Sequence, residues 1–481
     1  MKQLLFSLAI FTVFLLNAQP VISITGPTPP TRDHLEIQGY CDGKYVMVQN
    51  NPESTKRTTG KLFLYSADNK VLAQRDYKLN FKFNTIAMVK AILKKDKVVL
   101  FTAASGGNDW SKKPVLFWRV VCQDITMQEY DLSLQPIGAA KTIAVSKENY
   151  YNTSLVYSND GKYFALIGKA YKAEDKFRYQ LFNEKGEEIF AKDYSVPQCK
   201  YWTDMSESAI QLKDNGDLVF IVSDKNKDNA SDAYIYVIES ATQKIYSKKL
   251  EVAGKMVSNY PEMFLGADGS ITLAYDYGLA GKLWENKSGI AFDKLSSTLS
   301  VIAHKEIPFS AEAVKRYADS KQPGTLKSFR AEFREVKSGG YVAQVYERVR
   351  KQTGPEKWDM TNNNLFCIGF NDKFEVAYEH FLREVPKGSN WIIYRPIDIY
   401  TSGDNVYVFH GGTDDKVKNT KEEFEMYCTW WQHGKTQPQT IKVTNQYADV
   451  QMYTNYREIG ENTLLLAADA NAYFVMKIAN K

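Results

Sequence analysis

The 481-residue sequence lacks any long hydrophobic run beyond its first residues. A helix needs about 20 apolar residues to cross a bilayer, and no stretch after residue 18 approaches that length. The 61 Lys and Arg residues and the 56 Asp and Glu residues are interspersed, without the basic clusters that are typical of nucleic-acid binding. Beyond residue 18 we therefore expect neither a membrane span nor a nucleic-acid partner.

Cysteine and histidine are scarce, with five residues of each type. The cysteines form no Cys-x-x-Cys pair, so neither a zinc motif nor a redox motif is indicated. Cys122 and Cys199 are a candidate disulfide pair, whereas Cys367 and Cys428 lie in apolar runs typical of small buried residues. No His-Glu-x-x-His spacing and no Gly-x-Ser-x-Gly elbow occurs. The sequence therefore predicts no catalytic residue and no metal site, and it identifies no cofactor.

The first residues have the pattern of a secretory signal peptide. The segment "MKQLLFSLAIFTVFLLNA" has a cation at Lys2, an apolar run up to Leu16 and a small residue at Ala18. This run is too short for a membrane span and has the proportions of a signal h-region. We expect residues 1–18 to be removed, which makes the protein periplasmic or secreted, with one domain over residues 19–481. A buried N-terminal helix is the alternative.

A turn followed by a strand recurs along the chain. The stretch 157–168, "YSNDGKYFALIG", begins as a polar turn and ends as an apolar run. Asp, Asn and Gly accept the left-handed backbone of tight hairpins, and Val, Ile, Leu and aromatic residues favour strands. Eight such copies begin at Gly39, Leu93, Tyr157, Lys213, Gly266, Val336, Thr401 and Ile459.

A second hairpin usually follows each copy, as in "FRYQLFNEKGEEIFAKDYSV" after Gly168. Four strands per unit, apolar inside and charged at the last strand, are the grading expected of a propeller blade. Helical periodicity is nearly absent, and only "SAEAVKRYADS" near residues 310–320 could form a short helix. The sequence therefore predicts an all-β fold, an eight-bladed β-propeller. Seven blades or two separate β domains are the alternatives, and six blades would leave two copies outside the ring.

The chain ends indicate how this ring closes. The eighth unit has only three strands before Lys481, whereas residues 21–25, "VISIT", form a spare strand ahead of the first unit. An unpaired apolar strand would expose its edge. We therefore expect the N-terminal strand to complete the last blade from outside.

The copy "YSNDGKYFAL" resembles the Ser-x-Asp-Gly-Lys repeat of periplasmic Tol-type propellers and of the propeller domains of some serine peptidases. The resemblance covers about ten residues per blade and implies a fold rather than an activity. The peptidase nucleophile has no counterpart here, and Trp-Asp repeat propellers are a poorer match because no copy carries their closing dipeptide.

Four long insertions should lie on one face of the propeller. They contain "SGGNDWSKKP", "YGLAGKLWENKSG", "RVRKQTGPEKWDMTNN" and "GGTDDKVKNTKEE", and all fall where a second strand should lead into a third. Loops on a rigid scaffold frequently carry function. This face is therefore the predicted binding surface, and simple tolerance of insertions is the alternative.

Aromatic residues recur just before the innermost strands, where they would surround the mouth of the central channel. Such rings can stack on sugars or grip a peptide, or they can simply wedge between blades. Polar residues beside them could orient a ligand. The predicted ligand-binding residues are Tyr151, Trp202, Asp204, Tyr260, Glu262, Trp391, Arg395 and Tyr447.

Two functions fit this pattern. The first is an exported, non-enzymatic scaffold that binds a protein or glycan partner through the insertion-bearing face. The alternative is a polysaccharide-acting hydrolase or lyase with acids at the channel mouth, such as Asp204 paired with Glu262 or with Asp109.

Overall fold

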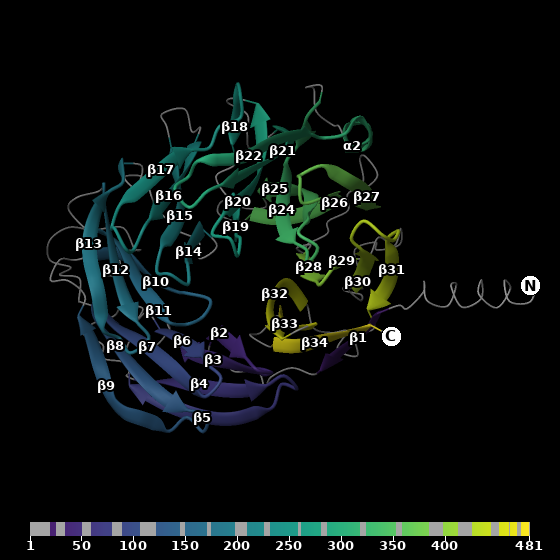
Figure 1. Ribbon diagram of the computed structural model, residues 1–481. Helices are drawn as coiled ribbons and strands as arrows, with labels where there is room; N and C mark the ends of the chain where they lie inside the picture. Colours follow the sequence, from purple (N-terminus) through teal and green to yellow (C-terminus); the bar gives the residue numbers. More distant parts are fainter. Residues whose placement is uncertain are drawn as a thin grey trace, which may run out of the picture.

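The computed structural model describes most of the chain after residue 19. The described residues are 20–25, 34–50, 59–78, 89–105, 122–144, 150–170, 175–197, 209–225, 231–257, 261–279, 286–317, 324–352, 358–383, 398–411, 426–443, 452–460, 462–468 and 473–480. In this part of the chain, eight small antiparallel sheets stand in a ring around a common centre (Figure 1). The protein is therefore an eight-bladed β-propeller, as the sequence predicted, and the seven-bladed and two-domain alternatives are wrong.

Each blade begins with a short strand next to this centre and continues outward. The innermost strands are β2 (His34–Cys41), β6 (Val89–Leu93), β10 (Tyr150–Tyr157), β14 (Ile210–Leu212), β19 (Glu262–Leu265), β24 (Phe329–Glu335), β28 (Asp398–Ser402) and β32 (Met452–Gly460). The second strands are β3 (Lys44–Asn50), β7 (Lys97–Ser105), β11 (Tyr163–Ala170), β15 (Leu218–Lys225), β20 (Ile271–Leu279), β25 (Tyr341–Gln352), β29 (Asn405–Gly411) and β33 (Thr463–Ala468).

The outer half of each blade is a second hairpin. The third strands are β4 (Thr59–Ser66), β8 (Cys122–Asp131), β12 (Lys176–Asn183), β16 (Ser231–Ile238), β21 (Asn286–Leu295), β26 (Trp358–Phe370), β30 (Met426–Gln432) and β34 (Tyr473–Asn480). The outermost strands are β5 (Val71–Lys78), β9 (Pro136–Ala144), β13 (Glu188–Ser195), β17 (Ile245–Lys249), β22 (Val301–Pro308), β27 (Val376–Arg383), β31 (Gln439–Val443) and β1 (Pro20–Thr25). Strands such as β22 are mostly exposed, which fits the charged fourth strand that the sequence predicted.

Blade five departs from this plan because it has additional elements. The strands β18 (Lys255–Val257) and β23 (Leu326–Lys327) pair with β20 and β21, so its sheet has six strands. The helix α2 (Ala311–Tyr317) follows β22, at the position where the sequence allowed a short helix. No helix in the described ranges is long and apolar enough to cross a membrane.

The repeated turn joins the first and second strands of every blade. Most of these turns contain a residue with a left-handed backbone, for example Asp42 (φ 51°), Gly161 (φ 68°) and Gly216 (φ 82°). Adopting φ > 0 requires Gly or a residue such as Asp or Asn that tolerates it, which explains the polar outline of the repeat.

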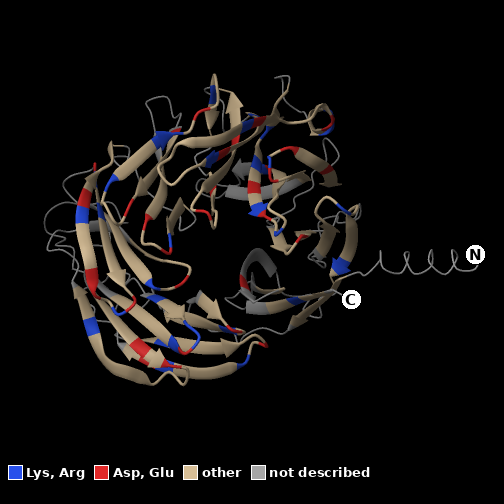
Figure 2. Ribbon diagram, in the orientation of Figure 1, with Lys and Arg blue, Asp and Glu red and all other residues tan. Residues whose placement is uncertain are grey.

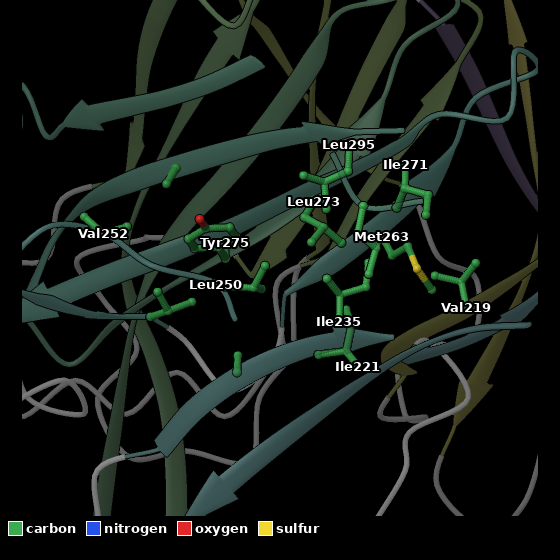
Figure 3. Close-up of a cluster of buried hydrophobic side chains, with 14 of the residues drawn as sticks. Val219, Ile221, Ile235, Leu250, Val252, Met263, Ile271, Leu273, Tyr275 and Leu295 are labelled. Atoms are coloured by element: carbon green, nitrogen blue, oxygen red, sulfur yellow. The ribbon is translucent and has the colours of Figure 1, made fainter. Parts of the chain in front are cut away.

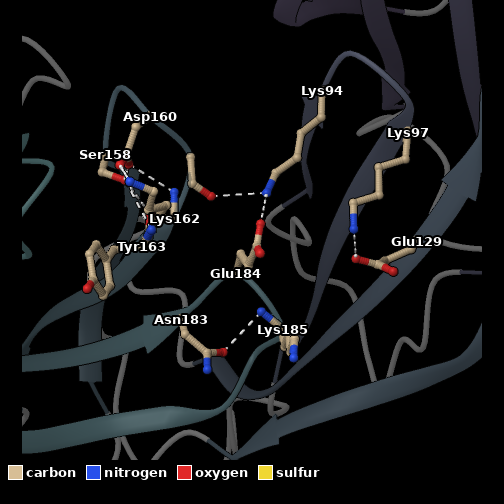
Figure 4. A network of polar contacts seen from close by, with 11 residues as sticks. Lys94, Lys97, Glu129, Ser158, Asp160, Lys162, Tyr163, Asn183, Glu184 and Lys185 are labelled. Carbon is tan, nitrogen blue, oxygen red and sulfur yellow. Dashed lines mark hydrogen bonds and ion pairs between the residues drawn. The ribbon is translucent and has the colours of Figure 1, made fainter.

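Polar side chains stabilise the turn after β10 internally. The Ser158 hydroxyl donates to Asp160 Oδ1 at 2.8 Å and accepts the Tyr163 N–H at 3.0 Å (Figure 4). Desolvation opposes ionisation of Asp160, but the hydrogen bonds from Lys162 and Ser158 outweigh it and lower the pKa of this carboxyl to about 2. The Ser-x-Asp-Gly-Lys motif is thus a self-contained turn whose residues are needed for its shape.

The same turns also connect neighbouring blades. Lys94 Nζ, from the turn of blade two, donates to the Gly161 carbonyl at 3.0 Å and contacts Glu184 at 3.1 Å (Figure 4). The Asp160 N–H donates to Asp214 Oδ1 in blade four at 2.9 Å, and Lys213 Nζ donates to the Gly269 carbonyl in blade five at 3.1 Å. Four successive blades are therefore linked along one face of the ring.

Apolar clusters fill the spaces between blades. Between blades four and five, Val219, Ile221 and Ile235 pack against residues of the next blade such as Leu273 and Leu295 (Figure 3). Each blade therefore buries both of its faces against neighbours, because a single four-stranded sheet cannot cover its own apolar side chains.

The described cysteines behave as the sequence indicated. Cys367 and Cys428 are free and fully buried in apolar clusters, and Cys41 is free and partly buried. Cys199 lies outside the described residues, so its proposed disulfide with Cys122 stays a prediction.

The N-terminal strand closes the ring. β1 pairs antiparallel with β34 from Pro20↔Asn480 to Thr25↔Val475, so the last blade has the order β1-β34-β33-β32. Ile22 and Ile24 pack against the apolar cluster between blades seven and eight. On the other side of blade eight, Lys477 of β34 forms an ion pair with Asp68 of blade one at 2.6 Å. The predicted closure is confirmed.

Replacing Ile22 and Ile24 together by Ala should lower the free energy of unfolding by about 3 kcal/mol, since both half-buried side chains lose their packing. Urea unfolding measures this change. Ser23→Ala, at the exposed position between them, is the matched control and should change stability by less than about 0.5 kcal/mol. Unchanged unfolding of the double variant would contradict closure by β1.

Candidate functional site

The antiparallel blades give the ring two faces with different loops. We call turn face the side that carries the connections from first to second and from third to fourth strands, such as residues 158–162 and 184–187. We call insertion face the opposite side, with the connections from second to third strands and from one blade to the next, such as residues 106–121 and 384–397. The connections on the turn face span six residues or fewer between strand ends, whereas the longest ones, such as residues 106–121 and 384–397, belong to the insertion face.

The four predicted insertions fall between the second and third strands of blades two, five, six and seven, but only two of them remain long. Residues 106–121 and 412–425 separate the strands of blades two and seven. In blades five and six the prediction of long insertions is wrong, because the strands extend into these segments and leave only residues 280–285 and 353–357 between them.

The ends of three of these connections are held close together, because Ser105 pairs with Cys122, Gln352 with Trp358 and Gly411 with Met426. Each of these three connections therefore starts and ends at directly paired residues, although a bulge precedes Ser105 in blade two.

Most of the predicted ligand-binding residues cannot be placed. Trp202, Asp204, Tyr260, Trp391, Arg395 and Tyr447 lie outside the described residues, as does Asp109. The backbone of Tyr151 lies in β10, opposite Lys169. Among the predicted ligand-binding residues, Glu262 is the one whose side chain the structure describes.

Glu262 is the first residue of β19 and faces blade six. Met263 points the other way, into the apolar cluster between blades four and five, whereas Phe264 packs between blades five and six. Because side chains alternate along a strand, Glu262 shares the face of Phe264. Its side chain is 27% exposed.

Both carboxylate oxygens of Glu262 contact β24, the innermost strand of blade six. Oε1 accepts the Phe333 N–H at 3.1 Å, and Oε2 lies 3.4 Å from Arg334 Nη1. The same Arg334 nitrogen donates to the Phe333 carbonyl at 2.8 Å. Glu262 thus joins two blades through the exposed edge of an inner strand.

The environment of Glu262 favours its neutral form. Desolvation among the surrounding protein atoms raises the pKa of this carboxyl to about 7, although Arg334 and the Phe333 N–H act in the opposite direction. The negative charge of Glu332 raises it further. A carboxyl that titrates near neutral pH can exchange a proton under physiological conditions.

A second carboxylate binds the same strand edge. Asp276 Oδ1 forms an ion pair with Lys287 Nζ at 2.7 Å, and both side chains are almost fully buried (5% and 7% exposed). Asp276 Oδ2 accepts the Ala331 N–H at 3.3 Å, two residues before the amide that Glu262 binds. Blade five therefore supplies two acceptors to backbone amides of β24 that have no strand partner on that side.

The sequence analysis missed the residues around Glu262. Glu332 and Arg334 lie on β24, and Tyr346 on β25 donates its hydroxyl to Glu332 Oε1 at 2.6 Å. The signal was present in "FRAEFRE", since alternating charges are unusual in an innermost strand that should be apolar. The cluster of Glu262, Glu332, Arg334 and Tyr346 combines two carboxyls, one guanidinium and one hydroxyl.

Two described histidines form hydrogen bonds, His410 within blade seven and His433 from blade seven to blade six. His410 Nε2 lies 2.9 Å from Thr429 Oγ1, and His433 lies between the Phe370 carbonyl (3.1 Å) and the Tyr378 hydroxyl (2.9 Å). Over the described ranges, no group of three or more His, Cys, Asp or Glu residues is arranged to hold a metal ion.

The titration of Glu262 should appear in the pH dependence of stability. Its pKa is about 7 in the folded protein against 4.5 for an unperturbed carboxyl, so between these values the folded state holds a proton that the unfolded state has lost. Relative to Glu262→Gln, the parent should therefore lose about 3 kcal/mol of stability as the pH rises from 4.5 through 7.

Urea unfolding of both proteins across this pH range measures the difference. Lys373→Gln, exposed on the turn face of blade six, is the control and should follow the parent. A constant difference between the parent and Glu262→Gln over the whole range would show that the pKa of Glu262 is the same in the folded and unfolded states.

No protein-family model matches the sequence, and no curated protein matches it. Among solved structures, the polysaccharide lyase Uly1 is similar at 11% identity and TM-score 0.42, over 95% of this chain and 99% of that one. The WD40 domain of SCAP from fission yeast is similar at 8% identity and TM-score 0.43, over 96% and 98%. The propeller domain of the Trilobed protease from Pyrococcus furiosus is similar at 13% identity and TM-score 0.38, over 86% and 99%. With no matching family model, the Tol-type likeness remains a resemblance of one turn.

Proposed function

We propose that this protein is an exported, non-enzymatic scaffold that binds a protein or glycan through the insertion face. The observation that carries this proposal is the one-sided distribution of the long connections. The two longest connections between second and third strands, residues 106–121 and 412–425, belong to the insertion face, whereas no connection on the turn face spans more than six residues between strand ends. Random tolerance of insertions would distribute them over both faces, because both consist of exposed hairpin ends.

The rest of the ring is suited to hold such loops rigidly. Apolar clusters join neighbouring blades, and the linked turns from Lys94 to Gly269 fix the opposite face. Loops whose two ends are fixed on a rigid frame lose less conformational entropy when they bind a partner. The rigid ring can therefore present these loops to a partner without a conformational change in the blades.

The composition of this face favours a protein or glycan partner. The aromatic positions 202, 260, 391 and 447 fall in blade-to-blade segments, and aromatic side chains are frequent anchors at protein interfaces and beneath sugars. Basic and acidic residues alternate over the described ribbon instead of forming one basic surface (Figure 2). Nucleic acid is therefore the less suitable ligand.

Export is part of the proposal and agrees with the position of the closing strand. Cleavage after Ala18 would leave Gln19 as the first residue, directly ahead of β1 at Pro20. The ring would then close with its complete N-terminal strand. A cut a few residues later would remove part of β1 and open the last blade.

The processed protein, isolated from its native host, should begin at Gln19. Mass spectrometry of the intact chain and of its N-terminal peptide measures this. Replacing Leu16 by Arg, which shortens the apolar run, should retain the full-length precursor inside the cell. Recovery of a chain that begins at Met1 from the exported fraction would contradict cleavage at this site.

The alternative is a polysaccharide-acting hydrolase or lyase. The raised pKa of Glu262 favours it, since a general acid needs a pKa near the working pH. However, both Glu262 oxygens are engaged with β24, and this contact by itself explains why the residue lies there. We therefore rank the scaffold first.

Shortening the insertions should abolish partner binding while the fold persists. In two variants an Asn-Gly turn replaces residues 106–121 or residues 412–425, since Ser105↔Cys122 and Gly411↔Met426 are already paired for a two-residue hairpin. Binding to an array of extracellular polysaccharides and to cell-envelope proteins is measured. At least one variant should lose roughly tenfold or more in affinity, equivalent to about 1.4 kcal/mol.

The control is Lys95→Ala combined with Lys373→Ala on the turn face, which should bind as the parent does. Parent-like binding by both shortened variants would refute the insertion face as the binding surface. Turnover of a polysaccharide that Glu262→Gln abolishes would instead establish the enzymatic alternative.

A further inference from the structure

The central channel contains a cavity of about 280 Å³ beside blades two to five. Residues from the innermost strands β6, β10, β14 and β19 and from the turn after β10 line it. Pockets for drug-sized ligands have volumes of roughly 300–1,000 Å³, so this cavity suits a smaller molecule. Its principal lining residues are Lys90, Tyr157, Asn159, Gln211, Leu212 and Leu265.

The cavity lies in the half of the channel next to the turn face. Leu212 and Leu265 are the last residues of β14 and β19, directly before their turns, and Asn159 is exposed in the turn after β10. A ligand would therefore enter from the side opposite the insertions. The cavity is separate from the surface proposed above for a macromolecular partner.

The lining is positively charged. Among the described lining residues, Lys90 carries the basic side chain and none is a carboxylate. The acidic residues nearest in sequence to the lining residues are Asp160 and Asp214, and both have other partners. Asp160 Oδ1 accepts the Lys162 N–H within its own turn, and Asp214 Oδ1 accepts the Asp160 N–H. Apolar neighbours such as Leu212 lower the local dielectric and strengthen the attraction of the ammonium for an anion.

Two carboxamides add hydrogen-bonding groups beside this cation. Gln211 Nε2 donates one hydrogen bond to the Met263 carbonyl at 2.9 Å, which orients the amide between β14 and β19. Its second N–H and its oxygen can serve a ligand. Asn159 supplies a further amide at the entrance, and an ammonium with three N–H groups can hold a protein contact and a ligand together.

One wall residue has an unsatisfied polar atom. The Tyr157 hydroxyl is buried and has no hydrogen-bond partner in the described part of the chain. The tyrosine ring packs edge-on against Phe101, with centroids 5.8 Å apart. Burial raises the pKa of this hydroxyl, so it stays protonated and able to donate. The Tyr157 side chain thus forms part of the apolar wall between blades two and three.

We propose that this cavity binds a small organic acid, with the carboxylate at Lys90 and with further polar groups at Gln211 and Asn159. An ammonium–carboxylate contact supported by amide N–H donors is a strong charge-assisted arrangement. The site would give the protein a small-molecule ligand in addition to its macromolecular partner. The two sites open on opposite faces and can be tested independently.

Calorimetric titration with glucuronate, malate and glucose tests the proposal. Glucuronate and glucose differ chiefly in one carboxylate, so they isolate its contribution. At least one of the two acids should bind saturably, and glucose should bind roughly tenfold or more weakly than glucuronate. Lys90→Gln should weaken acid binding by roughly ten- to a hundredfold, the loss expected for one charge-assisted hydrogen bond.

Lys95→Gln, an exposed lysine in the turn that follows β6, is the matched control and should bind as the parent does. Asn159→Ala changes an exposed turn residue and should weaken binding several-fold, which keeps the test valid if Lys90→Gln does not fold. Absence of saturable binding by both acids overturns the proposal. Equal affinity for glucose and glucuronate, or acid binding that neither cavity variant weakens, also overturns it. The variants with shortened insertions should retain acid binding. A failure of the insertion-face proposal can therefore be distinguished from a failure of the cavity proposal.

Discussion

The pairing of β1 with β34 is the interaction on which the rest of the structure depends. A ring of like sheets has no intrinsic end, so its last blade needs a strand from the start of the chain. β1 supplies six paired residues, and its Ile22 and Ile24 cover the cluster between blades seven and eight. With this strand in place, every blade is held on both sides, and all loops of one class lie on one face.

The centre of the ring imposes a second constraint. Innermost strands have one edge without a strand partner, and their buried N–H and C=O groups must be satisfied in another way. Side chains of adjacent blades do this. Asp276 and Glu262 accept amides of β24, and Gln211 donates to a carbonyl of β19. Polar residues near the centre of this propeller therefore stabilise the interfaces between blades, and this role does not require a ligand.

This constraint changes how Glu262 is interpreted. A carboxyl with a pKa near 7 in a channel would ordinarily be read as an acid catalyst. Here its two oxygens meet an amide and a guanidinium of the next blade, which is a sufficient reason for its position. The cavity around Lys90 is different, because it brings an ammonium and the carboxamides of Gln211 and Asn159 together at one open site.

In the proposed function, the turn face contributes to stability and the insertion face to recognition. The turn face has short turns connected by Lys94, Asp214 and Lys213, and its polar groups are largely used within the protein. The insertion face carries the long segments, whose ends are fixed at paired residues of regular hairpins. Changes in those segments can alter binding with little effect on the blades.

The sequence by itself determined the architecture, because the signals for it are local. Asp42, Gly161 and Gly216 mark turns that need a left-handed backbone, and the alternation of apolar residues after each turn defines the strands. Counting the turns predicted eight blades, and the spare strand at residues 21–25 predicted the closure. The short helix and the buried Cys367 and Cys428 followed from equally local patterns.

Only the tertiary structure decided which side chains meet across blades. Glu262 and Arg334 are 72 residues apart, and the cavity combines Lys90 with Gln211 from a blade two positions away in the ring. No periodicity encodes such contacts, because they depend on how far each inner strand reaches along the channel and on which neighbour it faces. The sequence could therefore name Glu262 as a channel residue, but its partners and its raised pKa follow from the packing of β19 against β24.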